Sequence, residues 1–184
     1  MRAVQGLGWW MTAWVAVACS RPPVLPPAQT DQNAVAPAEP EAQAASKITH
    51  FPGRGEVRLA GRPAAAAITV ELARTEPERE QGLMFRKSMA DDHGMLFFMP
   101  YDNDWVFYKR NTYIPLDMVF VGADWVVAGV LENVAPLTET HRSVGKPSRY
   151  ILELGAHQAG HQGIAAGTRL DFRPLPDAPP PAVR

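Results

Sequence analysis

The sequence predicts a mainly β domain with a compact, sandwich- or barrel-like arrangement and one or two short helices. Its apolar segments are short and closely spaced, which is typical of such domains. A glycine-containing turn at Gly122-Ala123-Asp124 joins two aromatic and β-branched segments, and this pattern predicts a β-hairpin. The sequence shows neither a run of βαβ units nor a glycine-rich phosphate loop, so a nucleotide-binding α/β fold is not expected.

Strands are expected where apolar residues alternate with polar ones or form short continuous runs. The segment from Ile68 to Leu72 alternates, whereas the segment from Met95 to Met99 is continuous and predicts a buried strand. The second arm of the hairpin is apolar on both faces, which predicts a central position in the sheet. The predicted strands are 68–72, 95–99, 105–110, 116–121, 125–131, 150–154 and 169–172, with a further candidate at 56–59 that glycines interrupt.

A short helix is predicted over residues 76–81. Thr75-Glu76-Pro77-Glu78 has the pattern of a capping box with proline in the first turn, and Gly82 is a common stop signal. A second helix containing His157 and His161 is disfavoured, because glycines stand at 155, 160 and 163.

The chain of 184 residues is expected to hold one folded domain between two proline-rich ends. Residues 20–65 are rich in proline and alanine and predict a partly extended tether. The folded domain is expected at 66–173. Residues 174–184 form a short tail with three consecutive prolines.

Residues 1–19 have the features of a bacterial export signal. Arg2 precedes an apolar stretch that is too short to span a bilayer comfortably, and the stretch ends at Cys19 in a sequence that resembles a lipobox. Cys19 would then carry a lipid and anchor the chain in a membrane. Ser20 favours the outer membrane, by resemblance to lipoprotein sorting in Gram-negative cells, so the chain is expected to face the periplasm or the cell surface. The alternative is a plain signal peptide with a coincidental cysteine.

The composition argues against several classes of function. Cys19 is the only cysteine, so the predicted domain has no thiol for a disulfide, a nucleophile or a metal site. The formal net charge of −1 lacks the basic character of a nucleic-acid binder. His157 and His161 have metal-ligand spacing, but no acidic residue completes the set, and the methionines are expected to fill the core. Neither a metal nor a cofactor is therefore expected.

Four motifs follow one another along the predicted domain: Gly82–Arg86, Gly94–Phe98, Asn111–Phe120 and Tyr150–Leu154. In this order they resemble the domain-of-unknown-function family 192, whose members are bacterial and archaeal and often exported. The resemblance implies a compact, mainly β fold and carries no activity, substrate or cofactor. The chain departs from the family at Tyr108-Lys109-Arg110, where Trp-Met-Lys is usual. This departure argues against a uniformly apolar pocket at the segment.

Two acidic residues inside apolar strands are the candidates for catalysis. Asp117 shares a strand face with Val119 and Val121, so a buried Asp117 needs hydrogen-bond donors, a cation or a proton. It could act as a general acid or base, or it could hold a loop by accepting backbone N–H groups, and the structural role is favoured. Glu153 presents the same choice, and an ion pair is favoured with one of Arg86, Lys109, Arg110 and Arg149.

The favoured functional hypothesis is a non-catalytic envelope module that binds a protein partner, a glycan or a small ligand. The expected binding residues are Arg86, Tyr108, Asn111, Thr112 and Asp117. The competing hypothesis is a hydrolase of envelope polymers that uses Asp117 or Glu153 as acid or base. Two carboxyls within about 5–10 Å in one open cleft would favour the enzyme. Buried carboxyls saturated by backbone donors would argue against it.

Overall fold

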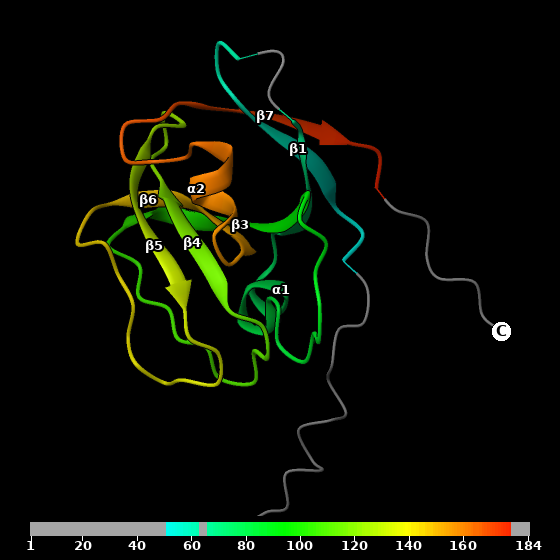
Figure 1. Cartoon of the computed structure of the whole chain (residues 1–184), viewed down its shortest axis with the longest axis vertical. Coiled ribbons are helices and arrows are strands. Elements are labelled where there is room, and N and C mark those ends of the chain that lie inside the picture. Colours follow the sequence, from blue (N-terminus) through cyan, green and yellow to red (C-terminus); the bar gives the residue numbers. More distant parts are fainter. Residues whose placement is uncertain (1–50, 63–65, 178–184) are drawn as a thin grey trace, which may run out of the picture. The chain divides into compact units, whose positions relative to one another are not determined.

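The computed structural model describes residues 51–62 and 66–177. The predicted export signal, Cys19 and most of the predicted tether lie outside the described residues. The described part contains seven strands and two short helices (Figure 1), which confirms the mainly β class. The elements are β1 (Arg54–Leu59), β2 (Ile68–Ala73), α1 (Glu76–Gln81), β3 (His93–Asn103), β4 (Leu116–Val121), β5 (Val127–Val134), β6 (Ser148–Gly155), α2 (Gln158–Gln162) and β7 (Leu170–Leu175).

The seven strands form one mixed sheet in the order β5-β4-β6-β3-β2-β1-β7. Neighbouring strands are antiparallel except β2 and β3, which run parallel and are connected through α1. Parallel neighbours need such a crossover, whereas a short turn suffices for the antiparallel hairpin of β4 and β5. The sheet begins at Arg54, before the boundary at 66 that the sequence indicated for the folded domain.

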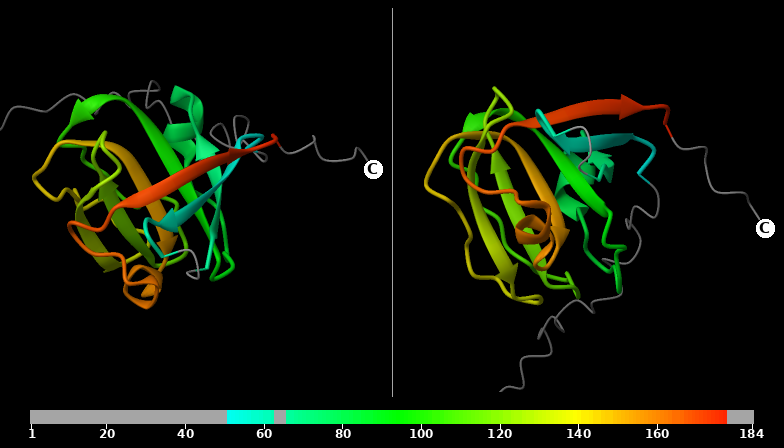
Figure 2. Two further views of the ribbon diagram at one scale, coloured as in Figure 1. Left: turned by 90° about the horizontal axis from the view of Figure 1, so that it is seen from above. Right: turned by 45° about the horizontal axis from the view of Figure 1, so that its top comes forward.

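The sheet is not closed, but its two edges approach each other at one end, as Figure 2 shows for β7 and the β4–β5 hairpin. The backbone N–H of Val127 donates to the carbonyl of Thr168, and the N–H of Leu170 donates to the carbonyl of Trp125. The ring of Trp125 stacks on Tyr150 and on Phe172 with centroid distances of 4.1 and 5.3 Å. These contacts tie the open end of the sheet together.

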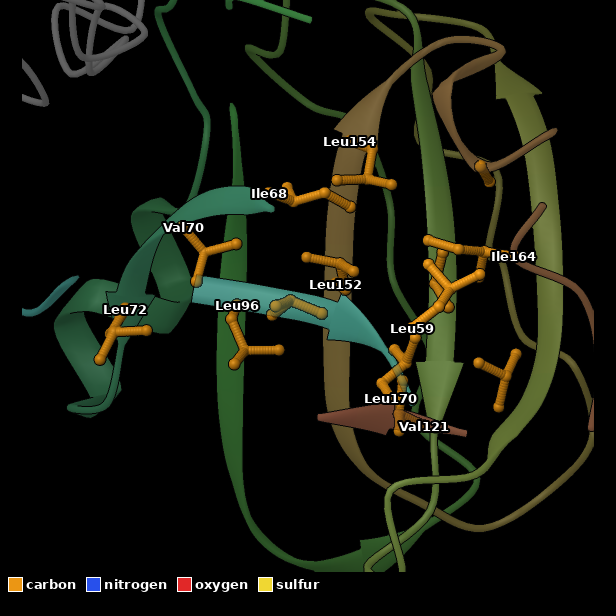
Figure 3. Close-up of a cluster of buried hydrophobic side chains, with 14 residues drawn as sticks. Leu59, Ile68, Val70, Leu72, Leu96, Val121, Leu152, Leu154, Ile164 and Leu170 are labelled. Atoms are coloured by element: carbon orange, nitrogen blue, oxygen red, sulfur yellow. The ribbon is translucent and has the colours of Figure 1, made fainter. Parts of the chain in front are cut away.

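An inner core lies on the face of the sheet that α2 covers. It takes side chains from all seven strands, from Ala159 in α2 and from Ile164 after it. Figure 3 shows these side chains converging on one interior. The buried members are Val57, Leu59, Ile68, Val70, Leu72, Leu96, Val119, Val121, Val127, Leu152, Leu154, Ala159, Ile164 and Leu170.

An outer core lies on the opposite face of the same sheet. Loops cover it, with Met89, Phe107, Ile114 and Val144 packed against the strands. The buried members are Phe51, Ala73, Leu83, Met95, Phe97, Leu116, Met118, Phe120, Val134 and Ile151. Because both faces are covered, all six residues of β4 are buried.

Helix α1 begins and ends at the predicted residues. The Thr75 side chain accepts from the N–H of Glu78 at 3.4 Å, and Glu78 Oε2 accepts from the N–H of Thr75 at 2.8 Å. Burial raises the pKa of Glu78, but hydrogen bonds from Thr75 and Arg74 lower it, and the pKa lies below its usual value. Gly82 ends the helix with a φ of 47°, and a Cβ there would lie 2.9 Å from the Phe97 ring.

The prediction of a strand at 105–110 is wrong. The segment forms only an isolated bridge between Phe107 and Arg142. Its residues do alternate between more exposed and more buried, with Val106 and Tyr108 exposed and Lys109 buried. The alternation in exposure arises because one side of this segment packs against the outer core. The segment does not pair with neighbouring strands of the sheet.

The central position predicted for the second hairpin arm is also wrong, because β5 is an edge strand. Both faces of β5 are apolar because both are covered. One face lies on the inner core, and Val144 packs against the other at Gly129. Two bulges interrupt the pairing of β5 with β4, one opposite Asp117 and one at Ala128. Lys146 Nζ also donates to the carbonyl of Ala128 at 3.2 Å. The edge is therefore irregular and partly covered.

Candidate functional site

A small cleft on the outer face brings together several residues that the sequence indicated and several that it did not. Its volume is about 40 Å³. The C-terminal end of α1 and the turn after it form one side, and the 107–112 segment forms the other. The lining residues are Arg79, Glu80, Gln81, Gly82, Leu83, Met84, Phe97, Phe107, Tyr108, Lys109, Thr112 and Glu153.

Backbone hydrogen bonds hold the 107–112 segment in place over the sheet. The N–H of Lys109 donates to the carbonyl of Thr138 at 2.7 Å, and the N–H of Leu137 donates to the carbonyl of Thr112 at 3.0 Å. Asn111 has a φ of 57°, and its carbonyl accepts from the N–H of Phe85 at 2.7 Å. The segment is thus fixed both to the following loop and to the turn after α1, so both sides of the cleft are positioned together.

A buried ion pair between Lys109 and Glu153 forms the polar part of the cleft. Lys109 Nζ donates to Glu153 Oε1, and the two residues are only 2% and 3% exposed. Glu153 alternates along β6 with Leu152 and Leu154 of the inner core, so its side chain points to the outer face. Each charge needs the other there, because a single buried charge would lose its hydration without compensation.

Asp117 lies on the inner face and is fully buried. The N–H of Asn133 donates to Oδ1 at 2.8 Å, and the N–H of Ala159 donates to Oδ2 at 2.9 Å. Asn133 belongs to the β5 bulge opposite Asp117, and Ala159 lies in the first turn of α2. One carboxylate thus satisfies the backbone of a bulge and of a helix start. This explains how α2 forms despite its glycines, against the expectation from the sequence.

The two candidate catalytic carboxylates are therefore on opposite faces of the sheet. In the pairing of β4 with β6, Asp117 is opposite Leu154 and Met118 is opposite Glu153, so the two acids differ by one position in register. A shift of one residue changes the face of the sheet. Asp117 and Glu153 cannot act together on one substrate.

The expected binding residues divide into two groups. Tyr108 and Thr112 line the cleft beside the ion pair. Arg86 does not line it: its guanidinium binds both carboxylate oxygens of Glu71 and lies over the Phe51 ring. The carbonyl of Asn111 accepts a hydrogen bond from the N–H of Phe85, as described above. Asp117 lies on the inner face of the sheet, away from the cleft.

Sequence reasoning missed the apolar residues of the cleft. Leu83 follows α1, Phe97 lies in β3, and Phe107 lies in the segment predicted as a strand. The available signal was Gly82, which was interpreted only as a helix stop. Because a Cβ at Gly82 would touch Phe97, this glycine also allows α1 to approach the sheet at the cleft.

The histidines and the two most deeply buried methionines stay apart from the cleft, whereas Met84 lines it. His157 precedes α2 and His161 lies within it. In the described residues no group of three or more His, Cys, Asp or Glu side chains could hold a metal ion. Met95 and Met118 are fully buried in the outer core. No helix of the described part is long and apolar enough to cross a membrane.

Asp117→Asn is expected to lower the free energy of unfolding by about 1–3 kcal/mol, because an amide nitrogen would face a backbone N–H group. Urea unfolding of the full-length chain measures the change. Asp171→Asn is the matched control, since Asp171 is exposed on β7, and it should change the free energy by less than about 0.5 kcal/mol. Equal midpoints for Asp117→Asn and the wild type would contradict the structural role.

Lys109→Met alone is expected to lower the free energy of unfolding by about 3–5 kcal/mol, because it leaves Glu153 buried without its partner. The double variant Lys109→Met/Glu153→Leu should recover most of that loss, since both charges are then absent. Denaturant unfolding of the two single variants and the double variant measures the coupling. Losses that simply add would show that the two side chains do not depend on each other.

Comparisons with known proteins give the family of the chain. Residues 57–172 match DUF192, a family described as an uncharacterized ACR. A proposed transcription regulator from Sinorhizobium meliloti 1021 has a similar structure, with 35% identity, a TM-score of 0.60, and 68% of this chain and 97% of that chain covered. A protein of unknown function from Novosphingobium aromaticivorans DSM 12444 has 33% identity and a TM-score of 0.57, with 64% and 83% covered. No curated protein matches the sequence. On the family match and the shared structure, the chain belongs to the DUF192 family.

Proposed function

We propose that this chain is an exported, lipid-anchored envelope protein whose β domain is a non-catalytic module that binds a glycan. The export and anchoring part rests on the apolar stretch of residues 1–19 and on the lipobox-like sequence that ends at Cys19. The proline-rich segment that follows would hold the domain at a distance from the outer membrane. No nucleic-acid partner is included, because the formal net charge of −1 gives little attraction for phosphates.

One observation carries the non-catalytic part of the proposal. Both buried carboxylates are already engaged, Asp117 by two backbone N–H groups and Glu153 by the Lys109 ammonium. They also lie on opposite faces of the sheet. Glycoside hydrolysis ordinarily needs two carboxyls on either side of one bond, about 5–10 Å apart. The pair considered from the sequence does not meet this requirement.

The cleft favours a glycan over a protein partner or a free small ligand. It is too small to enclose a whole molecule, yet it contains charged and hydroxyl-bearing side chains suited to hydrogen bonding. Tyr108 is 45% exposed at the same place. An exposed aromatic ring offers an apolar face with a polar edge, which suits the alternating apolar and hydroxyl surfaces of a sugar.

A hydrolase remains the second candidate, because two carboxyls, Glu153 and Glu80, line the same cleft. In that case Glu153 would be the acid or base, and it would have to exchange its bond with Lys109 for one with the substrate. The ion pair makes this the less supported function.

The anchor is tested by expressing the chain in a Gram-negative bacterium that is fed an alkyne fatty acid. The wild type should take up the probe and sediment with the outer membrane, since the Cys19 thiol is the acceptor. Cys19→Ser is the matched control and should remain unlabelled. A wild-type chain without label would contradict the lipid anchor.

The binding function is tested by co-sedimentation of the full-length chain with isolated, insoluble cell-wall glycan. The wild type should bind and release no new reducing ends. Tyr108→Ala should weaken binding, while Tyr101→Ala, which changes an even more exposed tyrosine outside the cleft, should not. New reducing ends that disappear in Glu153→Gln would favour the hydrolase, and the absence of binding would contradict the module.

A further inference from the structure

The cleft carries a more specific inference about the chemical group that it binds. Its charged lining residues are balanced, with Lys109 and Arg79 against Glu153 and Glu80. A phosphate, carboxylate or ammonium entering the cleft would upset this balance next to a buried ion pair, and an uncompensated charge is unfavourable there. A neutral polar group would not. The charges of the cleft therefore select a neutral guest.

The ion pair also offers hydrogen bonds of both kinds. An ammonium has three N–H groups and a carboxylate can accept about four hydrogen bonds. The single bond from Lys109 Nζ to Glu153 Oε1 leaves capacity on both groups. A guest with an acceptor and a donor on the same side could accept from Lys109 and donate to Glu153. An amide carbonyl with a hydroxyl close by has this pattern, whereas the N–H of a trans secondary amide points away from its own carbonyl.

The size of the cleft and its apolar lining residues further limit which chemical group it can bind. A volume of about 40 Å³ has room for roughly one to three water molecules, or a group of a few heavy atoms. Leu83, Phe97 and Phe107 supply apolar surface beside the ion pair. An uncharged group with a carbonyl and a methyl, next to a hydroxyl, would use all of these surfaces.

We propose that the cleft binds the acetamido group of an N-acetylated amino sugar. The carbonyl accepts from Lys109, a hydroxyl next to the acetamido group donates to Glu153, and the methyl packs against the apolar wall. Tyr108, exposed at the same cleft, contacts the sugar ring. The inference rests on the proposed glycan-binding function and names the sugar chemistry that the function would recognise.

The first test compares two trisaccharides with the full-length chain in detergent. Tri-N-acetylchitotriose carries acetamido groups, and cellotriose is the matched sugar without them. We expect titration calorimetry to give at least about tenfold weaker binding for cellotriose, because the ion pair then lacks its guest. In saturation-transfer NMR, the acetamido methyl hydrogens should receive more saturation than the ring hydrogens. Equal affinities, or a weak methyl signal, would overturn the inference.

The second test uses variants of the cleft. Lys109→Met/Glu153→Leu removes the pair together and should weaken the binding of tri-N-acetylchitotriose by about tenfold or more. Lys146→Met is the matched control, because Lys146 is exposed and lies outside the cleft. This variant should bind the trisaccharide with the affinity of the wild type. Tyr108→Ala changes an exposed side chain and should also weaken binding without unfolding the chain. Unchanged affinity in both cleft variants would overturn the inference.

Three further results separate this inference from the proposed function. Binding of an acetyl-lysine peptide without binding of tri-N-acetylchitotriose would place an acetylated protein in the cleft and overturn the sugar assignment. Binding of cell-wall glycan without binding of tri-N-acetylchitotriose would overturn the acetamido inference and leave the proposed function standing. Failure of cell-wall glycan to bind would overturn both.

Discussion

The fold depends on a sheet that is buried on both faces at its centre. In β4 and in residues 151–154 of β6, a polar side chain must find its partner inside the protein, because both faces of the sheet are buried there. Asp117 meets this constraint with two backbone N–H groups, and Glu153 meets it with Lys109. The two hydrogen bonds that Asp117 accepts stabilise the β5 bulge and the start of α2, so a buried carboxylate helps to hold the inner face together beside the apolar packing.

The same constraint gives the outer face its chemistry. Loops cover that face. A loop can place a long polar side chain over the sheet, whereas a second sheet packed there would present mainly apolar side chains. Lys109 comes from such a loop, and its position leaves a small cleft beside the pair. The site therefore depends on the 107–112 segment, which is fixed by backbone bonds to two neighbouring loops.

Much of the local structure was predictable from the sequence, and most of the site was not. The limits of α1 and of β4 follow from a capping box, a glycine and an apolar run, all of which are short-range signals. The sequence favours a structural role for Asp117 but does not identify its donors, because Asn133 and Ala159 are 16 and 42 residues away. The sequence indicates an ion pair for Glu153 and gives Lys109 as one of four candidate partners, but which of the four binds it depends on a long-range contact. The edge position of β5 was missed because two-sided burial does not reveal which neighbours a strand has.

The irregular edge of β5 bears on how copies of the protein behave when they are crowded together. A straight, uncovered edge strand offers a row of backbone groups on which another chain can add a strand. Here two bulges break that row, and the Lys146 side chain occupies one of its carbonyls while placing a charge beside it. Neighbouring molecules held at high local density thus meet a poor template for strand addition, and the domain can be concentrated on a surface without assembling through this edge.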